Sequence, residues 1–169
     1  MLAHPHGENH PRLMSSFYFE DASQGPPQNT TDGSIISRGI DANGKCTNGW
    51  VCEHRWSPIA NMIEFRAVTA GEDVKSFNNI ESNQISFCRG NKGFIAINNS
   101  LRDLKATVDA CVPDGVYCDV ISGELVDGQC TGKTITVSGG KATIEILRFS
   151  DGILATHIKA KPSLCSCNA

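Results

Sequence analysis

The second half of the chain is dominated by short runs in which apolar and polar residues alternate. The first two, "QISFCRG" and "GFIAINN", flank the turn Arg89-Gly90-Asn91-Lys92-Gly93, as the strands of a hairpin do. Five more runs follow, separated by turns that contain Gly or Asp: "LKATVDAC", "GVYCDVISG", "KTITVS", "KATIEIL" and "ILATHIKA". The two glycines of "SGGK" at 138–141 favour another hairpin, because glycine readily adopts positive φ. Strands at this spacing, without helices between them, predict an antiparallel sandwich or Greek-key barrel.

A helical period precedes the strands. Four side chains fall on one face of a helix that begins near residue 57: Ile59, Met62, Ile63 and the stem of Arg66. Ser57 followed by Pro58 suits an N-cap and a first helical position. If the helix began nearer Glu53 instead, Pro58 would kink it.

The first fifty residues have too few apolar side chains for a core of their own. They are rich in Gly, Pro, Asn, Asp and Ser, and "QGPPQNTTDG" at 24–33 is a loop. The one run typical of a strand is "RLMSSFYF" at 12–19. An apolar run flanked by long loops indicates a strand of a sheet whose other members lie elsewhere.

Composition and charge indicate an ordinary globular protein. A length of 169 residues allows one domain, or one domain with part of another, and 40% hydrophobic residues are enough for a core. The net charge of -3, without a long basic run, gives no electrostatic reason to expect nucleic acid or an anionic membrane as a partner. No apolar run approaches the roughly 18–20 residues needed to span a bilayer.

Cysteine usage points to export. Eight cysteines, an even number, suit an oxidised, secreted protein. Two N-glycosylation sequons, at Asn29 and Asn98, are compatible with secretion. The first residues nevertheless lack the basic start and long apolar stretch of a secretory signal. We interpret this mismatch as a sign that Met1 is an internal methionine of a longer protein.

The segment "KCTNGWVCEHRW" at 45–56 allows a metal site or a disulfide. Cys46, Cys52 and His54 could supply three zinc ligands, but no CxxC or HxxxH partner follows to complete the coordination. A disulfide that closes a small loop is therefore favoured, and it would stabilise the fold by roughly 2–3 kcal/mol.

The other cysteines allow further pairs, whose connectivity spacing alone does not fix. Cys118 and Cys130 bracket a strand and a turn, and Cys88 and Cys111 lie in or beside predicted strands. Cys165 and Cys167 are too close together to bridge without strain.

The residues themselves do not form a recognisable catalytic site. Glycosidases place two carboxylates across the bond they cleave, but the acidic residues are scattered and we interpret them as solvated surface charges: Glu8, Glu20, Asp21, Glu53, Glu64, Asp119 and Glu145. A GxSxG nucleophile elbow and a Gly-rich phosphate loop are absent. Trp56, beside a helix start, is expected to pack in a core, whereas Trp50 could either pack or serve as a platform for a sugar ring.

An ordered series of motifs resembles animal-type, chloride-dependent α-amylases. The motifs run from "MLAHP" and "MSS" through "GPP", "GWVCEHRW" and "SNQISF" to "RGNKGFI", "YCDVISG" and "CTGK". The resemblance implies a secreted enzyme in which a (β/α)8 barrel is followed by an antiparallel Greek-key domain. Residues 1–69 would be the end of the barrel, with its last strand at 12–19 and its last helix at 57–68, and residues 70–169 the β domain.

The resemblance also implies disulfides and an anion site. Cys46 with Cys52, and Cys118 with Cys130, match disulfides of the family. Vertebrate members lack cysteine at the positions of Cys88 and Cys111, which suggests an extra bridge in an invertebrate-type relative. Arg12 matches the arginine that binds chloride, where the anion would tune the pKa of the general acid. A local ion pair with a carboxylate is the alternative role of Arg12.

The function implied by the resemblance belongs to a longer parent protein. The parent would be monomeric and would hydrolyse internal α-1,4-glucosidic bonds of starch, glycogen and malto-oligosaccharides with retention. Its three catalytic carboxylates and its calcium ligands would precede residue 1, so the 169 residues are expected to be inactive and to hold no metal. The alternatives are a stand-alone module that binds glucans or has a structural role, and a zinc-binding regulator if Cys46 and Cys52 are reduced.

Overall fold

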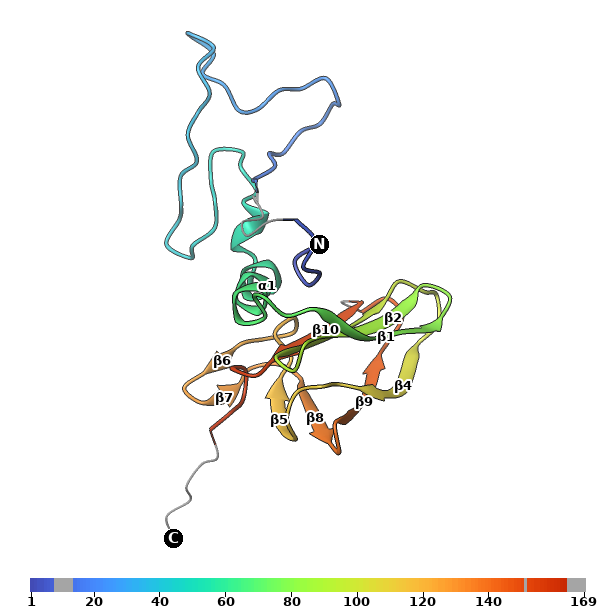
Figure 1. Cartoon of the computed structure of the whole chain (residues 1–169). Coiled ribbons are helices and arrows are strands. Elements are labelled where there is room, and N and C mark those ends of the chain that lie inside the picture. Colours follow the sequence, from blue (N-terminus) through green and yellow to red (C-terminus); the bar gives the residue numbers. More distant parts are fainter. Residues whose placement is uncertain (8–13, 151, 164–169) are drawn as a thin grey trace.

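The fold combines a projecting N-terminal part with a β domain (Figure 1). A computed structural model of the chain describes residues 1–7, 14–150 and 152–163. Arg12, Glu8, Cys165 and Cys167 lie outside the described residues. No helix in the described ranges is long and apolar enough to cross a membrane.

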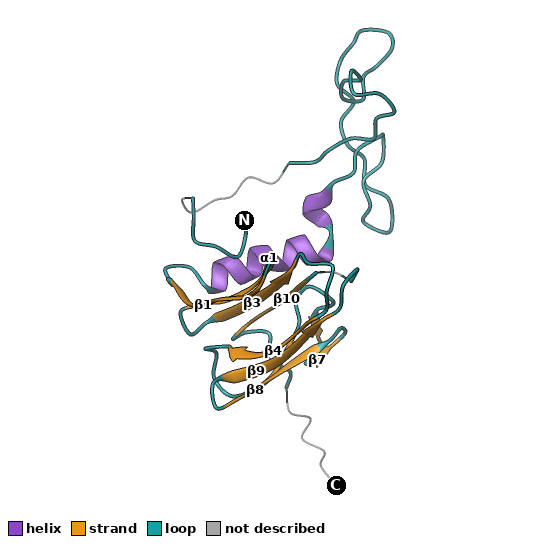
Figure 2. Ribbon diagram, turned by 90° about the vertical axis from the view of Figure 1, so that its right-hand side faces the viewer, coloured by secondary structure: helices purple, strands orange, loops and turns teal. Residues whose placement is uncertain are grey.

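Two four-stranded antiparallel sheets form the β domain. The first has the order β1 (Val74–Glu81), β2 (Gln84–Arg89), β3 (Gly93–Asn98), β10 (Ile153–His157). The second has the order β4 (Leu104–Asp109), β9 (Lys141–Ile146), β8 (Thr134–Ser138), β5 (Gly115–Cys118), and a short hairpin pairs β6 (Leu125–Val126) with β7 (Gln129–Cys130). The two sheets stack face to face (Figure 2). The predicted antiparallel β domain is confirmed, in the form of a sandwich.

Local hairpins and long-range pairs together build the sandwich. β2 and β3 form the predicted hairpin, in register from Gln84 opposite Asn98 to Arg89 opposite Gly93. β8 and β9 form the second one, and Gly139 and Gly140 at its turn have φ values of 58° and 73°. β10 returns from the end of the domain to pair with β3. Non-neighbouring segments therefore close both sheets.

Three strands of the first sheet, β2, β3 and β10, are buried on both faces, whereas the edge strand β1 is largely exposed. The helix α1 (Ser57–Val68) lies across its outer face (Figure 2). Phe94, Ala96 and Leu154 point between the two sheets, whereas Ile95 and Ala155 belong to the cluster beneath the helix. The second sheet buries one face, as the strict alternation along β9 shows. The β domain thus has a layer of helix and two layers of sheet.

The predicted helix is present, and of its predicted inward face Met62 is buried, Ile59 and Arg66 are partly buried, and only Ile63 is exposed. Its first residue is Ser57, not Pro58, and Trp56 occupies the N-cap position. The fully buried side chain is Phe65, next to Met62, while Ile63 is 43% exposed. Phe65 packs against Gly93 of β3 and His157 of β10, so the buried side of the helix is centred on Phe65 and Ile63 lies outside it.

The predicted strand at 12–19 is not observed in its described part, residues 14–19. A single isolated bridge joins Phe17 to Trp50. A strand needs a partner that offers a row of backbone groups, and here the segment faces only the short loop around Trp50. Met14 and Phe19 are consequently 85% and 60% exposed.

Candidate functional site

Three disulfides fasten the chain. They join Cys46 to Cys52, Cys88 to Cys111 and Cys118 to Cys130, with Cα–Cα distances of 5.9, 6.0 and 5.2 Å. All three expected pairs are therefore present. A zinc site at Cys46 and Cys52 is ruled out, because a disulfide sulfur is not available as a thiolate ligand. Within the described ranges, no group of three or more His, Cys, Asp or Glu side chains could hold a metal ion.

The loop closed by Cys46 and Cys52 docks on the segment that precedes the long N-terminal loop. The Tyr18 amide donates to the Gly49 carbonyl at 2.8 Å, and the Cys52 amide donates to Ser15 Oγ at 2.7 Å. Glu53 accepts hydrogen bonds from the hydroxyl and amide of Ser16, which lower the pKa of the Glu53 carboxyl. These contacts fix the position of Trp50 inside the loop.

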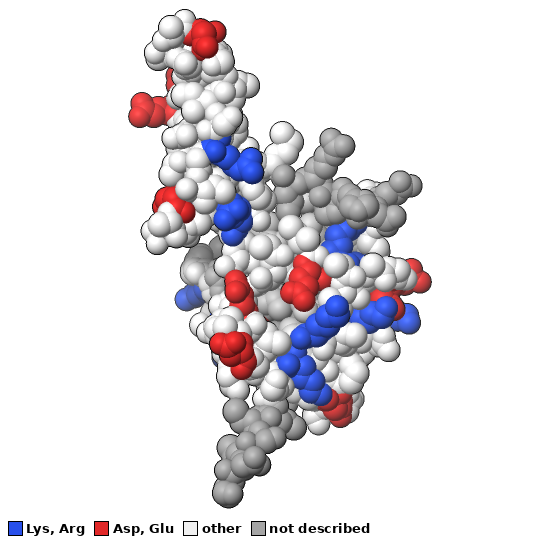
Figure 3. All heavy atoms as spheres, turned by 90° about the vertical axis from the view of Figure 1, so that its left-hand side faces the viewer, with Lys and Arg blue, Asp and Glu red and all other residues white. Residues whose placement is uncertain are grey.

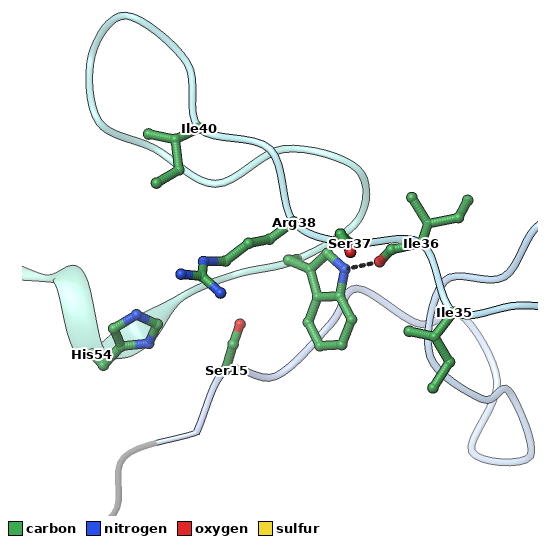
Figure 4. Close-up of a pocket in the computed structure, with 8 residues that line it drawn as sticks. Ser15, Ile35, Ile36, Ser37, Arg38, Ile40 and His54 are labelled. Carbon is green, nitrogen blue, oxygen red and sulfur yellow. Dashed lines mark hydrogen bonds between the residues drawn. The ribbon is translucent and has the colours of Figure 1, made fainter.

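A groove of about 690 Å³ opens beside Trp50 (Figure 4). The Trp50 indole N–H donates to the Ile36 carbonyl at 2.8 Å, and the ring meets Phe17 edge-on with centroids 6.2 Å apart. Figure 4 shows Arg38 and His54 toward one end of the groove and Ile35 toward the other. The complete lining is Ser15, Ile35, Ile36, Ser37, Arg38, Ile40, Trp50 and His54.

The groove can bind a polar ligand but cannot cleave a glycosidic bond by the usual route. Its lining offers hydroxyls, a guanidinium, an imidazole and an indole, and contains no carboxylate. Retaining glycosidases need two carboxyl groups, one as the acid and one as the nucleophile. The His54 Nδ1 atom is buried and finds no hydrogen-bond partner among the described atoms.

Trp56 corrects a prediction. It is 53% exposed rather than packed in a core. Trp56 is the N-cap residue of α1 and contributes to neither buried cluster of the described residues.

A second, smaller cavity of about 200 Å³ lies between α1 and the β domain. Asn61 of the helix donates from Nδ2 to the carbonyls of Val120 and Gly123, at 2.9 and 3.0 Å. His157 of β10 is buried, with its ring centroid 6.3 Å from that of Phe65. Burial lowers the pKa of His157, although Glu64 on the helix opposes this shift. These contacts show that the cavity belongs to the packing interface between α1 and the β domain.

Asp119 was interpreted from the sequence as a surface charge, and that interpretation is wrong. The side chain is buried. Its Oδ1 accepts from the amides of Ile121 and Ala155 at 3.2 and 3.0 Å, and its Oδ2 accepts from the Ser122 amide at 3.2 Å. Asp119 therefore ties the turn after β5 to β10. Of the other acids in that group, Glu53 is half-buried, and four are exposed: Glu20, Asp21, Glu64 and Glu145.

Two arginines bind backbone carbonyls of the N-terminal segment, a role that the sequence analysis predicted for neither of them. Arg89 is buried and donates to the carbonyls of Ala3, Thr69 and Glu72 at 2.7, 3.0 and 3.0 Å. Arg66 donates to the carbonyls of His4, His6 and Gly7 at 2.8, 3.3 and 3.1 Å. No local sequence pattern predicts the contacts with residues 3–7, because those partners lie 59 to 86 positions from the arginines.

Charges of opposite sign lie close together on the surface of the described residues. Figure 3 shows Lys and Arg interspersed with Asp and Glu over the face in view. Several are paired directly, as Lys105 is with Glu145 at 2.6 Å and Lys141 with Asp109 at 2.7 Å.

The geometry thus defines a disulfide-bonded, antiparallel β sandwich with a helix packed on one sheet and an N-terminal part that extends from it. Residues 75–159 match the family described as alpha amylase, C-terminal all-beta domain, and the chain belongs to this family. The resemblance recognised from the motifs is confirmed.

Curated relatives extend the match beyond the β domain. The alpha-amylase-related protein of Drosophila willistoni is 51% identical over 162 residues, and that of Drosophila melanogaster is 49% identical over the same length. In both cases the alignment covers 95% of this chain and 32% of the relative. The chain therefore spans about a third of the length of these relatives.

A solved structure agrees with this result. Alpha-amylase I of Eisenia fetida superposes with a TM-score of 0.76 and 34% sequence identity, covering 93% of this chain and 33% of the earthworm chain. The earthworm enzyme has also been solved, as a variant, in complex with maltohexaose.

Proposed function

We propose that the chain is the C-terminal part of a secreted α-amylase that cleaves internal α-1,4-glucosidic bonds of starch and glycogen with retention. The observation that carries this proposal is the extent of the match. Relatives align with 95% of the chain, so the match includes the loops before the β domain as well as the domain itself. A β domain borrowed by an unrelated protein would match only over the domain. The catalytic carboxylates would belong to the preceding part of the parent.

Exposed apolar side chains indicate that the N-terminal part packs against another structural element in the parent protein. Met14, Tyr18 and Phe19 are exposed on one segment, and Ile63 is exposed on the helix face that points away from the sheet. Exposed apolar surface of this extent marks a contact with another structural element. A (β/α)8 barrel whose last strand is 12–19 and whose last helix is α1 would cover both. The proposed division is accordingly 1–69 for the barrel end and 70–169 for the β domain.

Ions belong to the same proposal. Arg12 would be a chloride ligand of the parent, and the anion would raise the pKa of a neighbouring general acid, as a like charge does. Calcium would be held by residues of the preceding part. In the parent, we expect Arg12→Gln to abolish the dependence of starch hydrolysis on chloride, measured as the rate with chloride against the rate with nitrate.

The first experiment is a hydrolysis assay on the purified 169-residue chain. Reducing-sugar release from soluble starch is measured with calcium and chloride present, beside a known α-amylase. We expect a rate equal to the blank, because the groove has no carboxylate pair. Hydrolysis above the blank that co-purifies with the chain would overturn the proposal. Recovery of the 5′ end of the transcript then tests for an open frame that encodes barrel strands and an export signal.

The second candidate is a stand-alone module, which the groove beside Trp50 and the exposed Trp56 favour. Limited proteolysis distinguishes the two. A barrel fragment should be cut within residues 14–50 much sooner than within 74–157, because isolated bridges rather than a sheet hold the loops. Equal resistance of both parts, together with retardation of the chain in a native gel containing glycogen, would favour the module.

A further inference from the structure

The two sequons of the chain lie in contrasting environments. Asn29 lies in the long loop of the N-terminal part, and Asn98 ends β3 inside the sandwich. We propose that the exported protein carries an N-linked glycan on Asn29 and that the folded chain leaves Asn98 unmodified. The inference rests on the export that the proposed function includes, and it does not depend on hydrolysis.

The backbone groups of Asn29 are hydrogen-bonded, and its side-chain amide is exposed to solvent. The Asn29 amide donates to the Ser34 carbonyl at 2.8 Å, and the Gly33 amide donates to the Asn29 carbonyl at 2.9 Å. These bonds form the tip of a small hairpin, closed by a bridge between Gln28 and Ile35. Because the backbone groups are already paired within the tip, a substituent on the side chain would disturb none of them.

The side chain of Asn29 is oriented by its own sequon. Its Oδ1 accepts from the Thr31 amide at 3.0 Å, which brings the first and third sequon residues together. The side chains of Asn29, Thr30 and Thr31 are exposed. Among the described atoms, no acceptor binds Asn29 Nδ2. The nucleophilic amide nitrogen and the Thr31 hydroxyl are therefore both accessible to an enzyme.

The site is also distant from the packed part of the molecule. The long loop that contains Asn29 extends away from the sandwich (Figure 1). A branched oligosaccharide at its tip would meet solvent rather than the β domain.

Asn98 is a structural residue. It is 7% exposed, and its Nδ2 donates to the carbonyls of Arg102 and Ile146, both at 2.9 Å. Its Oδ1 accepts from Gln84 Nε2 at 3.2 Å and from the Ser100 amide at 3.1 Å. A sugar on Nδ2 would replace one of the two donated hydrogens and would occupy the space between β3 and the end of β9. A buried carbonyl left unpaired is unfavourable, so the glycosylated form cannot adopt this fold.

The proposed step is a group transfer with a lipid-linked donor. A bond forms between Asn29 Nδ2 and the anomeric carbon of the first sugar of an oligosaccharide carried on a polyprenyl pyrophosphate. The bond between that carbon and the pyrophosphate oxygen breaks, the amide loses one proton, and the lipid pyrophosphate leaves. The donor and its transferase belong to the export compartment that the three disulfides also require.

The test uses the full chain with an appended, cleavable export signal in insect cells. The disulfide-bonded monomer is collected, treated with a peptide N-glycosidase, and mapped by mass spectrometry of its peptides. We expect a mobility shift of one glycan, which is lost in Asn29→Gln and in Thr31→Ala and is retained in Thr31→Ser. The Thr31 pair is the matched control, because serine preserves the sequon and alanine destroys it.

Two results would overturn the inference. One is a disulfide-bonded monomer without a glycan on Asn29, and the other is such a monomer with a glycan on Asn98. If the chain is retained inside the cell, the same peptide map on the retained, disulfide-bonded pool decides the question. The outcome is independent of starch hydrolysis, so a failure here leaves the proposed function intact.

Discussion

Replacement of Phe65 by alanine tests the packing of helix on sheet. Phe65 is fully buried at the centre of the cluster beneath α1. Its ring lies so close to β3 that a Cβ added to Gly93 would be 2.9 Å from two of its atoms. It also meets the ring of His157, the β10 residue paired with Gly93, edge-on. The site is enclosed by a helix and two strands and has little freedom to collapse around a void.

The expected cost follows from that enclosure. Phe→Ala changes in cores lower the free energy of unfolding by about 3–5 kcal/mol. The higher helix propensity of alanine offsets this loss in the free energy of unfolding by about 0.5 kcal/mol. With a urea dependence of about 1–3 kcal/mol/M, a loss of about 3 kcal/mol lowers the midpoint of unfolding by about 1–3 M. Ile63→Ala is the matched control, since Ile63 lies on the exposed side of the same helix and should cost less than about 1 kcal/mol.

Unfolding in urea, with the disulfides intact, measures both variants. Far-UV circular dichroism reports the sheets, and hydrogen exchange reports each strand separately. Should Phe65→Ala release the helix alone, the amides of α1 and β3 lose protection while those of β8 and β9 keep it. The reasoning is refuted if Phe65→Ala and Ile63→Ala have equal midpoints and equal exchange protection, because the helix would then not be packed on the sheet in solution.

Three further predictions concern the same domain. The double change Cys88→Ser and Cys111→Ser opens a loop of sequence separation 23 and should lower the free energy of unfolding by about 3.4 kcal/mol on the chain-entropy model. The fold should be unchanged and the urea midpoint lower, and an unchanged midpoint would contradict the prediction. Burial lowers the pKa of His157, so the unfolded chain takes up a proton at higher pH than the folded chain does. The stability that neutral, buried His157 contributes is complete above the ordinary histidine pKa of 6.5 and is lost as the pH falls below it. His157→Gln should therefore lose less stability than the wild type between pH 7.5 and 5.5. An equal loss in both proteins would refute this role of His157. Asn61→Ala leaves two carbonyls without their donor and should cost about 1–3 kcal/mol by thermal or urea unfolding, and an unchanged midpoint would count against this role of Asn61.

The strands with the clearest alternation were predictable, and the least regular strand was not. β8 and β9 alternate strictly between buried and exposed positions, and their turn has two glycines at positive φ. β1 escaped prediction because its sequence, "VKSFNNIE", is mostly polar and its pairing with β2 is broken by register shifts. None of its residues is buried, so its apolar side chains give no clear pattern along the chain.

The disulfide of the candidate site could be predicted from the sequence, whereas the exposure of individual side chains could not. The resemblance anticipated that Cys46 pairs with Cys52, because both lie in one contiguous motif. The exposure of Trp56 and the burial of Asp119 contradicted the expectations for each residue type. Both depend on which distant segment arrives at that position, and spacing along the chain contains no such information.

The sequence alone determined the antiparallel β class, the helix near residue 57 and the family, because each rests on neighbours a few positions apart or on contiguous motifs. The tertiary structure decided which helix face is buried, that residues 14–19 lack a sheet to join, and which of Asn29 and Asn98 is accessible. It also brought Arg89 to the carbonyl of Ala3, 86 positions away. The physical reason is that periodicity and turn chemistry act locally, whereas burial and hydrogen-bond partners are set by segments that meet only when the chain has folded.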